Sequence, residues 1–424
     1  MNFIWNSLYN ILIVHLGVFF YHVFSIFSQK MRKGIAGRRK TLGEIEKLRR
    51  KYPDQKLFLF HSASLGEYEQ VKPVVKGIKE KANEVIAVVS FTSPSGYENA
   101  DRIEAVDLYI YLPFDTYFTT RKFLQLLRPD KIIFVTYELW PNLLAVAKKL
   151  GISTYLISAR IRSTSRKWKF YTKNYFASLY RSVDFIFSVT DDDKYELEKI
   201  LKDDKKVIKT LGDPRYDQVI QRSEKRNTKN IPRFFDEGFI ISAGSVWEQD
   251  LAVITRPMIE LLKTNPQVKL IIAPHETDDG HVVPIINDFS SAGLPVSRYS
   301  EMSGQCETQV LVVDRIGILA ELYHQSHLAF VGGSFKKAIH NVMEPAIAGI
   351  PVIFGPFYQN SREAQLLVKM EGGFSLTTGD AFLSKVKELM KNPENYQRIA
   401  RASKNVILSN KGAGEKIVME ILKD

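Results

Sequence analysis

The sequence has a single cysteine, Cys306, among its 424 residues. An intramolecular disulfide is therefore excluded, and the composition suits a reducing compartment. The chain also lacks a GxGxxG turn after its first predicted strand and lacks the GxxxxGK[ST] motif. The sequence therefore gives no support for a dinucleotide-binding site or for a P-loop. The histidines are scattered without metal-ligand spacing, and we predict no metal site. We find no internal repeat and no low-complexity tract.

What the chain does have is an excess of positive charge. The formal net charge is +12, with 45% hydrophobic and 25% charged residues. The hydrophobic and charged fractions are those of a folded protein, and the length allows two domains with full cores. The positive balance predicts an anionic partner, which could be nucleic acid, a phospholipid surface or a phosphorylated substrate.

The N-terminal segment narrows that choice. Residues 3–27 carry no charge and are rich in Ile, Leu, Val and Phe, and a basic run follows directly. About 20 apolar residues suffice to cross a bilayer, and a basic flank is typical of the cytoplasmic side. We therefore predict a membrane anchor over residues 1–30 that holds the protein at the cytoplasmic face of the cell inner membrane. Polar residues within the segment leave open whether it spans the bilayer or lies in its interface. Membrane lipid becomes the expected anionic neighbour, and we expect no nucleic-acid partner.

After the anchor, short apolar runs alternate with helical patterns. This alternation predicts an α/β fold of two doubly wound, Rossmann-like domains. We place them at residues 31–220 and 233–424, joined by the polar linker 221–232. Ligands of such folds bind at the carboxyl ends of the strands. The predicted strands are residues 57–61, 85–91, 108–112, 132–136, 154–158 and 185–189 in the first domain, and 239–243, 269–273, 310–313, 328–331 and 351–354 in the second.

Two carboxylates follow strands of the first domain. Glu67 ends the loop HSASLGE, in which Gly66 permits a close backbone approach, and Glu138 precedes Trp140-Pro141. A carboxylate at a strand end can act as a general base on an incoming hydroxyl. Each glutamate could equally interact only with the start of the following helix. Two acids at two strand ends of one sheet favour the functional interpretation.

Several cations follow other strands of the same domain. Arg160, Arg162 and Arg166 lie in ARIRSTSRKW, and Arg215 lies in GDPRYD. Guanidinium groups pair with phosphates through two hydrogen bonds, although a solvated loop can have the same composition.

The second domain contains a strand, a glycine turn and a helix within residues 328–374. Asn341 is predicted to open the helix, with Glu344 completing a capping box and Gly349 ending it. Such a helix start can bind an anion, whereas the simpler interpretation is an ordinary βαβ unit in which Glu344 only caps its helix. His275, at another strand end, is a candidate for contact with a base or a phosphate.

The ordered motifs of the chain resemble a known family. The segments HSASLGE, TYELWPNLL, SARIRS, GDPRYD, APHE and VGGSFKKAIHNVMEPAIAGIPVIFGP are similar to those of the lipid A Kdo transferases (3-deoxy-D-manno-octulosonic acid transferases). Members of this family are membrane-associated glycosyltransferases of the GT-B architecture. The resemblance covers nearly the whole chain, and the series is far more specific than any single motif.

The resemblance implies a role for individual residues. Glu67 would be the catalytic base, and Glu138 and Arg215 would stabilise the transition state. Separately from the resemblance, we predict that Ser64, Gly66, Arg160, Arg162 and Arg166 bind the acceptor. The nucleotide would contact two residues of the APHE turn and two further short segments: Pro274, His275, Ile316, Gly317, Ile318, Asn341, Val342, Met343 and Glu344.

The chain departs from the family at several of these positions. The family usually has Arg where His275 stands, Met-Gly-Glu at residues 316–318, Lys at Arg215 and Pro at Val342. The missing glutamate at Ile318 puts that nucleotide contact in doubt, whereas backbone contacts around Gly317 would survive.

The function implied by the resemblance is inverting transfer of Kdo from CMP-Kdo to a lipid A precursor (lipid IVA) in lipopolysaccharide synthesis, without metal or other cofactor. Both substrates are anions, in agreement with the basic balance. One alternative is a GT-B enzyme that uses another nucleotide sugar on a membrane acceptor. Another is a non-catalytic, membrane-anchored lipid- or nucleotide-binding protein. The sequence predicts no oligomeric state.

Overall fold

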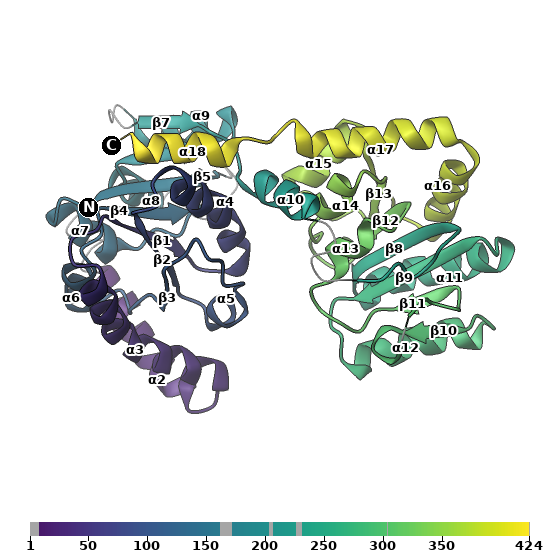
Figure 1. Cartoon of the computed structure of the whole chain (residues 1–424), viewed down its shortest axis with the longest axis horizontal. Helices are drawn as coiled ribbons and strands as arrows, with labels where there is room; N and C mark the ends of the chain where they lie inside the picture. Colours follow the sequence, from purple (N-terminus) through teal and green to yellow (C-terminus); the bar gives the residue numbers. More distant parts are fainter. Residues whose placement is uncertain (1–7, 162–171, 203–206, 226–230, 303, 424) are drawn as a thin grey trace. The chain divides into compact units, whose positions relative to one another are not determined.

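The computed structural model describes residues 8–161, 172–202, 207–225, 231–302 and 304–423. The chain divides into two compact units, unit 1 (residues 1–218 and 412–424) and unit 2 (residues 219–411). Each unit contains a seven-stranded sheet whose paired strands are all parallel (Figure 1). This confirms the predicted pair of Rossmann-like α/β domains.

The first sheet has the strand order β3-β2-β1-β4-β5-β6-β7. Its strands are β1 (Leu57–Ser62), β2 (Ile86–Phe91), β3 (Leu108–Tyr111), β4 (Lys131–Val135), β5 (Ser153–Ala159), β6 (Phe185–Ser188) and β7 (Val207–Thr210). The helical segments are η1 (Tyr9–His15), α2 (Leu16–Ser25), α3 (Gln29–Lys51), α4 (Leu65–Lys81), α5 (Pro94–Asn99), α6 (Tyr117–Leu127), α7 (Pro141–Lys149), α8 (Lys173–Arg181), α9 (Asp191–Leu201), α10 (Arg215–Glu224) and α18 (Ala413–Leu422).

The second sheet has the order β10-β11-β9-β8-β12-β13-β14. Its strands are β8 (Phe239–Val246), β9 (Val268–Pro274), β10 (Val296–Arg298), β11 (Val310–Val312), β12 (Leu328–Val331), β13 (Val352–Phe354) and β14 (Gly373–Ser375). The helices are α11 (Glu248–Thr264), α12 (Asp279–Ser291), the 3-10 turn η3 (Tyr299–Glu301), α13 (Leu319–Tyr323), α14 (Met343–Ala348), α15 (Arg362–Lys369), α16 (Gly379–Lys391) and α17 (Pro393–Leu408).

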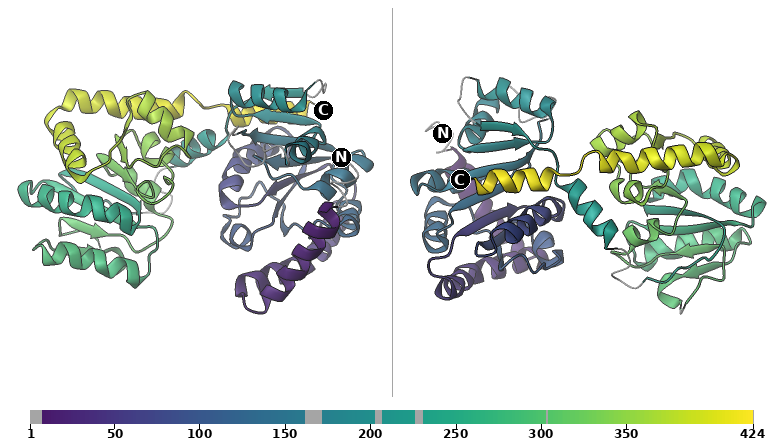
Figure 2. Two further views of the ribbon diagram at one scale, coloured as in Figure 1. Left: turned by 180° about the vertical axis from the view of Figure 1, so that it is seen from behind. Right: turned by 45° about the horizontal axis from the view of Figure 1, so that its top comes forward.

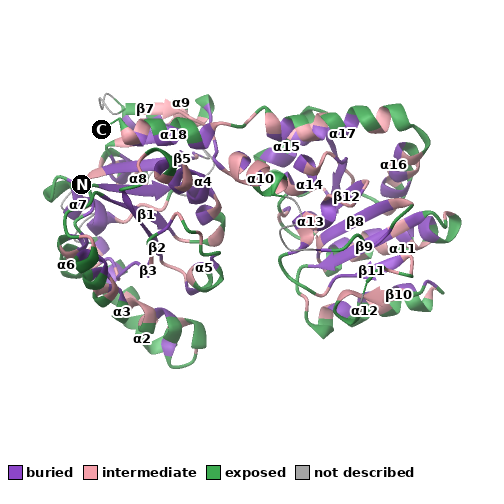
Figure 3. Ribbon diagram, in the orientation of Figure 1, coloured by how far each residue is buried: buried purple, intermediate pink, exposed green. Residues whose placement is uncertain are grey.

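Both faces of the first sheet are covered, which explains why its strands are continuous apolar runs (Figure 3). Alternate residues of β1 point to opposite sides, so Leu57 and Leu59 pack in one cluster and Phe58 and Phe60 in another. The first cluster includes side chains of α3, α6, α7, α8 and α9, and the second includes those of α4 and α18.

The C-terminal boundary of the second domain differs from our prediction of residues 233–424. The last helix, α18, lies beside α4 and belongs to unit 1 (Figures 1 and 2). Three of its side chains, Ile417, Val418 and Ile421, are fully buried under the first sheet. Gly77 of α4 permits the close approach, because a Cβ atom there would lie 2.9 Å from Val418. The predicted linker 221–232 also starts too early, since α10 continues to Glu224.

The N-terminal segment forms the helices η1 and α2, and α3 follows them. Within the described ranges, no individual helix combines the length and apolar character needed to cross a bilayer. The pair Tyr9–Ser25 and Gln29–Lys51 meets both conditions when taken together, with a bend of 120° between its members.

Candidate active site

The strand order of the first sheet reverses between β1 and β4, so the carboxyl ends of these strands form its topological switch point. Glu67 lies there, in the first turn of α4, and is 8% exposed. Its Oε2 accepts hydrogen bonds from the amides of Ala63 (2.5 Å) and Ser64 (3.3 Å). The carboxylate therefore completes a capping box, as in the simpler of our two interpretations, and is held in place by backbone donors.

The loop after β4 carries the second predicted carboxylate. Thr136 has a φ of +59°, an uncommon conformation for a β-branched residue, and it marks a sharp turn out of the strand. Glu138 follows and is half-buried. Trp140 donates its Nε1–H to Nε2 of His61 in β1 over 2.9 Å. Because this bond joins the chain after β4 to β1, the structure brings the SLGE and YELWP motifs to one edge of the sheet.

His61 is fully buried and accepts this hydrogen bond as a neutral imidazole. Burial lowers its pKa to about 3. Its Nδ1 lies 3.0 Å from Oγ of Ser90, which occupies the next strand, β2. The sequence interpretation assigned no role to His61, and the structure makes it the connection between three strands.

Two predicted cations meet on one buried acid. Asp213, which follows β7, pairs with Arg160 over 2.5 Å and with Nη2 of Arg215 over 2.7 Å. Burial alone would raise the pKa of Asp213, but the charges of Arg215 and Arg160 outweigh it and lower the pKa to about 2. The pairing fixes both guanidinium groups at the carboxyl edge of the sheet, which was not evident from their separation of 55 residues in the sequence.

The other predicted acceptor residues lie at the start of α4 or outside the described ranges. Ser64 and Gly66 are exposed at the start of α4, where a substrate can reach them. Arg162 and Arg166 lie outside the residues that the structure describes.

The switch point of the second sheet lies between β8 and β12, which are neighbours. Two predicted nucleotide residues, Pro274 and His275, are next to it at the end of β9, and His275 is exposed. The ring of His275 stacks on that of Trp247, with centroids 4.3 Å apart, and on that of His340 at 4.5 Å. Trp247 donates its Nε1–H to Nε2 of His340 over 2.9 Å. The sequence motifs indicate no role for Trp247 or His340 at this edge.

Asp250 holds two loops together at the same edge of the sheet. It is fully buried in the first turn of α11 and accepts hydrogen bonds from the amides of Trp247 (2.9 Å), Gly333 (2.7 Å) and Phe335 (3.1 Å). These bonds tie the loop after β8 to the loop after β12. Asp250 was missed in the sequence, although an acid three residues after the strand-end Trp247 has the same spacing as Ser64 and Glu67.

Of the predicted nucleotide contacts at residues 316–318, the first two are accessible at a turn and the third is buried. Ile316 is 79% exposed, and Gly317 has a φ of +89°, a turn conformation that suits glycine. Ile318 is buried in an apolar cluster with Leu322 and Phe234. Since its side chain supports the core, only the backbone near Gly317 and the exposed Ile316 remain candidates for ligand contact.

The predicted capping box at Asn341 and Glu344 is wrong. Helix α14 begins at Met343, and Oδ1 of Asn341 accepts a hydrogen bond from the Met343 amide over 3.0 Å. Glu344 instead pairs with Arg222 over 2.9 Å. The N-cap residue is Val342, so the helix starts one residue later than the spacing indicated. Val342 is buried beneath this turn.

A cavity of about 460 Å³ adjoins Glu344 within unit 2. Arg222 lines it and also approaches Glu321 at 3.5 Å, so the arginine lies between two carboxylates. The other lining residues include Ser223, Lys225, Ile231, Arg233, His324, Gln325, His327 and Ile347.

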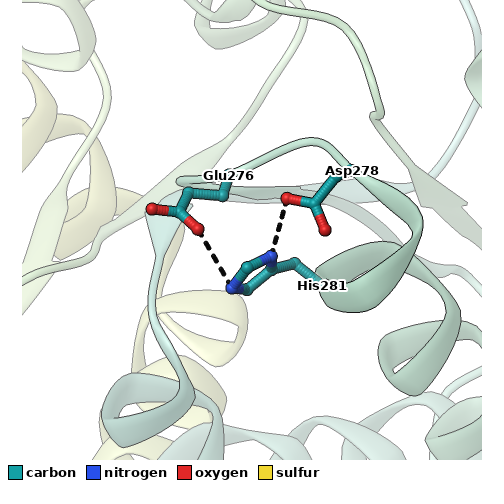
Figure 4. Close-up of side chains that lie close together, drawn as sticks. All are labelled: Glu276, Asp278 and His281. Atoms are coloured by element: carbon teal, nitrogen blue, oxygen red, sulfur yellow. Dashed lines mark hydrogen bonds and ion pairs between the residues drawn. The ribbon is translucent and has the colours of Figure 1, made fainter. Parts of the chain in front are cut away.

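Metal-ligand residue types gather at one exposed place in the described part of the chain (Figure 4). Nδ1 of His281 lies 2.9 Å from Asp278, and Nε2 lies 3.2 Å from Glu276. The hydrogen bond to Asp278 raises the pKa of His281, which favours the imidazolium form. The three groups therefore form an ion-paired surface cluster, and we assign no metal to it.

Comparison with known proteins shows that the chain is similar to one family of enzymes. Residues 36–218 match the family model described as 3-Deoxy-D-manno-octulosonic-acid transferase (kdotransferase). The 3-deoxy-D-manno-octulosonic acid transferase of Aquifex aeolicus is 27% identical over 359 residues, which are 82% of this chain and 91% of the relative. That of Haemophilus influenzae is 25% identical over 376 residues, or 88% and 87% of the two chains.

Solved structures agree on the fold. The UDP-GlcNAc 2-epimerase of Neisseria meningitidis is 17% identical, with a TM-score of 0.62 over 88% of this chain and all of that one (100%). A glycosyltransferase of Rickettsia africae is 11% identical, with a TM-score of 0.57 over 88% and 100%. These likenesses support the two-domain GT-B architecture. The family model and the curated relatives support assignment of the chain to the 3-deoxy-D-manno-octulosonic acid transferase family of glycosyltransferases.

Proposed function

We propose that the protein transfers Kdo from CMP-Kdo to a lipid A precursor, lipid IVA, with inversion at the anomeric carbon and without a metal. The observation that carries the proposal is that the positions to which the resemblance assigns catalytic roles all lie on the carboxyl side of the first sheet. Glu67, Glu138 and the Arg160–Asp213–Arg215 group all follow strands of the first sheet on its carboxyl side. Their chemistry suits attack by a hydroxyl of a phosphorylated acceptor.

Glu67 takes the proton of the acceptor hydroxyl as its oxygen attacks the sugar. A carboxylate has about four lone-pair sites, and the amides of Ala63 and Ser64 use two of them. These two bonds also stop the carboxylate from rotating, so its position is set before the substrate binds. A base held in this way needs no rearrangement in the reaction.

Glu138 and Arg215 stabilise the charge that develops in the transition state, and fixed cations replace a metal in this role. Asp213 keeps Arg215 and Arg160 in a defined orientation while neutralising only part of their charge. Arg160, with Arg162 and Arg166, binds acceptor phosphates, and Ser64 and Gly66 border the acceptor.

The nucleotide binds in unit 2. The candidate contacts are Pro274 and His275, the backbone at residues 316–318, and residues 341–344, with Glu344 on the ribose. A carboxylate that accepts from hydroxyl groups is a usual means of holding a ribose. In the free chain the Glu344 carboxylate pairs with Arg222, so ribose binding competes with this ion pair.

The N-terminal helices hold the enzyme in the interface of the cell inner membrane, on its cytoplasmic face. Tyr9 donates to the buried Asp115 over 2.8 Å, and Asn10 and Asn142 are hydrogen-bonded. The polar side of η1 is thereby packed on unit 1. The exposed apolar residues of η1, α2 and the turn after them are Ile11, Leu12, Ile13, Leu16, Phe19, Phe20, Val23, Phe24, Ile26 and Phe27. A helix with one docked polar side and one exposed apolar side suits a position in the interface.

Vesicle co-sedimentation tests this attachment. A double substitution, Phe20→Glu with Phe24→Glu, should release most of the protein from vesicles that contain anionic lipid. Tyr195→Glu is the matched control, because Tyr195 is a 63% exposed aromatic residue on α9. Equal binding by the double variant and the control would contradict attachment through α2.

Mass spectrometry of the reaction products tests the function itself. Purified protein incubated with CMP-Kdo and tetra-acylated lipid IVA should yield a lipid heavier by one or more Kdo residues. Parallel incubations with UDP-sugars should yield none. Transfer from a UDP-sugar would support the alternative donor, and the absence of any product would contradict the proposal.

A further inference from the structure

The loop after β12 places an ammonium group on an aromatic ring at the switch point of the second sheet. Nζ of Lys336 lies 3.3 Å from the centroid of the Trp247 ring. Lys336 is exposed, and among the described residues it forms no ion pair with a carboxylate. A Lys–Trp contact of this kind orients the ammonium without neutralising its charge. The positive charge thus remains available to an anion.

The rings beneath this ammonium form a small platform. Trp247 and His340 are joined by their hydrogen bond and are inclined by only 16°, and His275 stacks against both. Burial, and then the charges of His275 and Lys336, lower the pKa of His340 to about 4, so its ring is neutral near pH 7. Because Nε2 of His340 accepts from Trp247, its proton is on Nδ1, which is then a further donor.

The backbone that carries this platform is tightly packed. Gly332 and Gly333 approach the chain so closely that a Cβ atom would lie 2.3 Å from the Ser245 carbonyl oxygen and 2.4 Å from that of Ala338, respectively. Asp250 holds the amide of Gly333. A loop fixed in this way keeps Lys336 and His340 in place before a ligand arrives, which lowers the entropy cost of binding.

We propose that Lys336, oriented by Trp247, together with His340 forms a subsite for an acidic group of the sugar nucleotide. The inference rests on the proposed function and extends it to residues outside the predicted nucleotide contacts. Ligands of doubly wound sheets bind at the switch point, which is where this subsite lies. The donor has two groups of the required chemistry, the phosphate and the sugar carboxylate, and both are oxyanions that an ammonium and an N–H can bind.

Lys336→Gln is the direct test, with Lys337→Gln as its matched control. Both lysines are exposed in the same loop, but among the described contacts only Lys336 lies on the Trp247 ring. For each variant we would measure the Kd of cytidine and of CMP by calorimetry and the KM of CMP-Kdo. Loss of a hydrogen-bonded charge pair should weaken binding of the acidic ligand about 10- to 100-fold. Cytidine has no acidic group, and its Kd should not change.

The pattern among ligands identifies the bound group. A higher Kd for CMP together with a higher KM for CMP-Kdo assigns the subsite to the phosphate. A higher KM for CMP-Kdo with an unchanged Kd for CMP assigns it to the sugar carboxylate. Trp247→Leu, which removes the ring beneath Lys336, should reproduce the same pattern with a smaller change, provided that its melting temperature shows it to be folded.

Either of two results with Lys336→Gln would overturn the inference. Binding of all three ligands by Lys336→Gln as tightly as by the wild type would show that Lys336 contacts none of them. Equal weakening of cytidine and CMP would show that the residue supports the fold or the base. If the wild-type protein binds neither CMP nor CMP-Kdo, the proposed function fails and the inference falls with it. Wild-type binding with an unaffected Lys336→Gln contradicts the inference alone.

Discussion

The two switch points share two structural features, a Trp–His hydrogen bond and an acid in the first turn of a helix. In unit 1, Trp140 donates to His61, and in unit 2, Trp247 donates to His340, each over 2.9 Å. Each bond joins segments that belong to the two strands flanking the switch point. Each first helix after the opening strand also has an acid at its third position, Glu67 in α4 and Asp250 in α11.

The two acids differ in what they bind. Asp250 is fully buried and accepts three backbone amides from two different loops, so its oxygens serve the fold. Glu67 accepts two amides of its own loop and keeps 8% of its surface exposed. The same local motif therefore yields a structural acid in one unit and a candidate base in the other. The difference lies in the neighbouring loop, which only tertiary structure supplies.

Glu67→Gln should have the largest effect on turnover. Gln retains the shape but cannot accept the proton, and general-base catalysis contributes about 100- to 10,000-fold. We therefore expect the initial rate with CMP-Kdo and lipid IVA to fall on that scale. Glu69→Gln, on the same helix, is the control and should keep a near-normal rate. A Glu67→Gln enzyme as active as this control would remove the distinction between Glu67 and Asp250.

Asp213→Asn should have the next largest effect, on stability. Removing a buried partner leaves Arg160 and Arg215 without their counter-charge, which costs about 3 kcal/mol. We choose the lower end of the usual range because both guanidinium groups are partly exposed. The pKa of about 2 lies below the unfolded value near 3.9.

The stabilisation by Asp213 is therefore present above pH 4 and is lost as the pH falls towards 2. Urea denaturation of both proteins at pH 7 and pH 3 measures it. The difference in the free energy of unfolding between wild type and Asp213→Asn should shrink at pH 3. A difference that is independent of pH would contradict the ion-pair explanation.

Much of the fold, but little of the coupling between loops, could be predicted from the sequence. The central strands are apolar runs with both faces buried, and all of them were found. The strands that were missed, β7, β10 and β14, all lie at sheet edges, where a strand needs fewer apolar residues. Helix α18 was assigned to the wrong unit because its apolar residues alone do not reveal which sheet they cover.

The candidate site shows the same division. Glu67 and Glu138 were recognisable because each lies in the first few residues after a predicted strand. Asp213 was not, because its role depends on Arg160, which is distant in the sequence. Glu344 had the spacing of a capping box, yet a later helix start and the charge of Arg222 determine its contacts.

The two Trp–His pairs predict a matching pH dependence. His61 has a folded pKa of about 3, against about 6.5 when unfolded. The unfolded chain therefore binds a proton below pH 6.5 that the folded chain does not, and stability falls as the pH is lowered from 6.5 towards 3. Between pH 6.5 and pH 5 the loss should be about 2 kcal/mol.

His61→Gln keeps an acceptor for Trp140 and should lack this loss, which urea denaturation at pH 7 and pH 5 would show. His340→Gln should lack a similar loss, because the folded pKa of His340 is about 4. The same pH dependence in wild type and His61→Gln would mean that this imidazole is protonated in the folded chain.

The smallest effects on stability concern Glu344. Its ion pair with Arg222 is partly exposed, and such pairs contribute about 0–1 kcal/mol. Glu344→Ala should therefore change the melting temperature little while raising the Kd for CMP. Arg222→Gln breaks the same ion pair but keeps the carboxylate, so its Kd for CMP should not rise. Equal weakening in both variants would assign the effect to the ion pair instead of to a contact with ribose.

The central claim is that unit 2 binds the nucleotide and unit 1 carries the catalytic residues. The Kd for CMP, measured for variants of both units, tests this claim most directly. Calorimetry of Glu67→Gln and Asp213→Asn in unit 1 should give values within about twofold of the wild type, a difference below about 0.5 kcal/mol. Glu344→Ala in unit 2 should bind CMP measurably more weakly. If the unit 1 variants lose CMP affinity as much as Glu344→Ala does, the nucleotide is not held by unit 2 alone, and the account is contradicted.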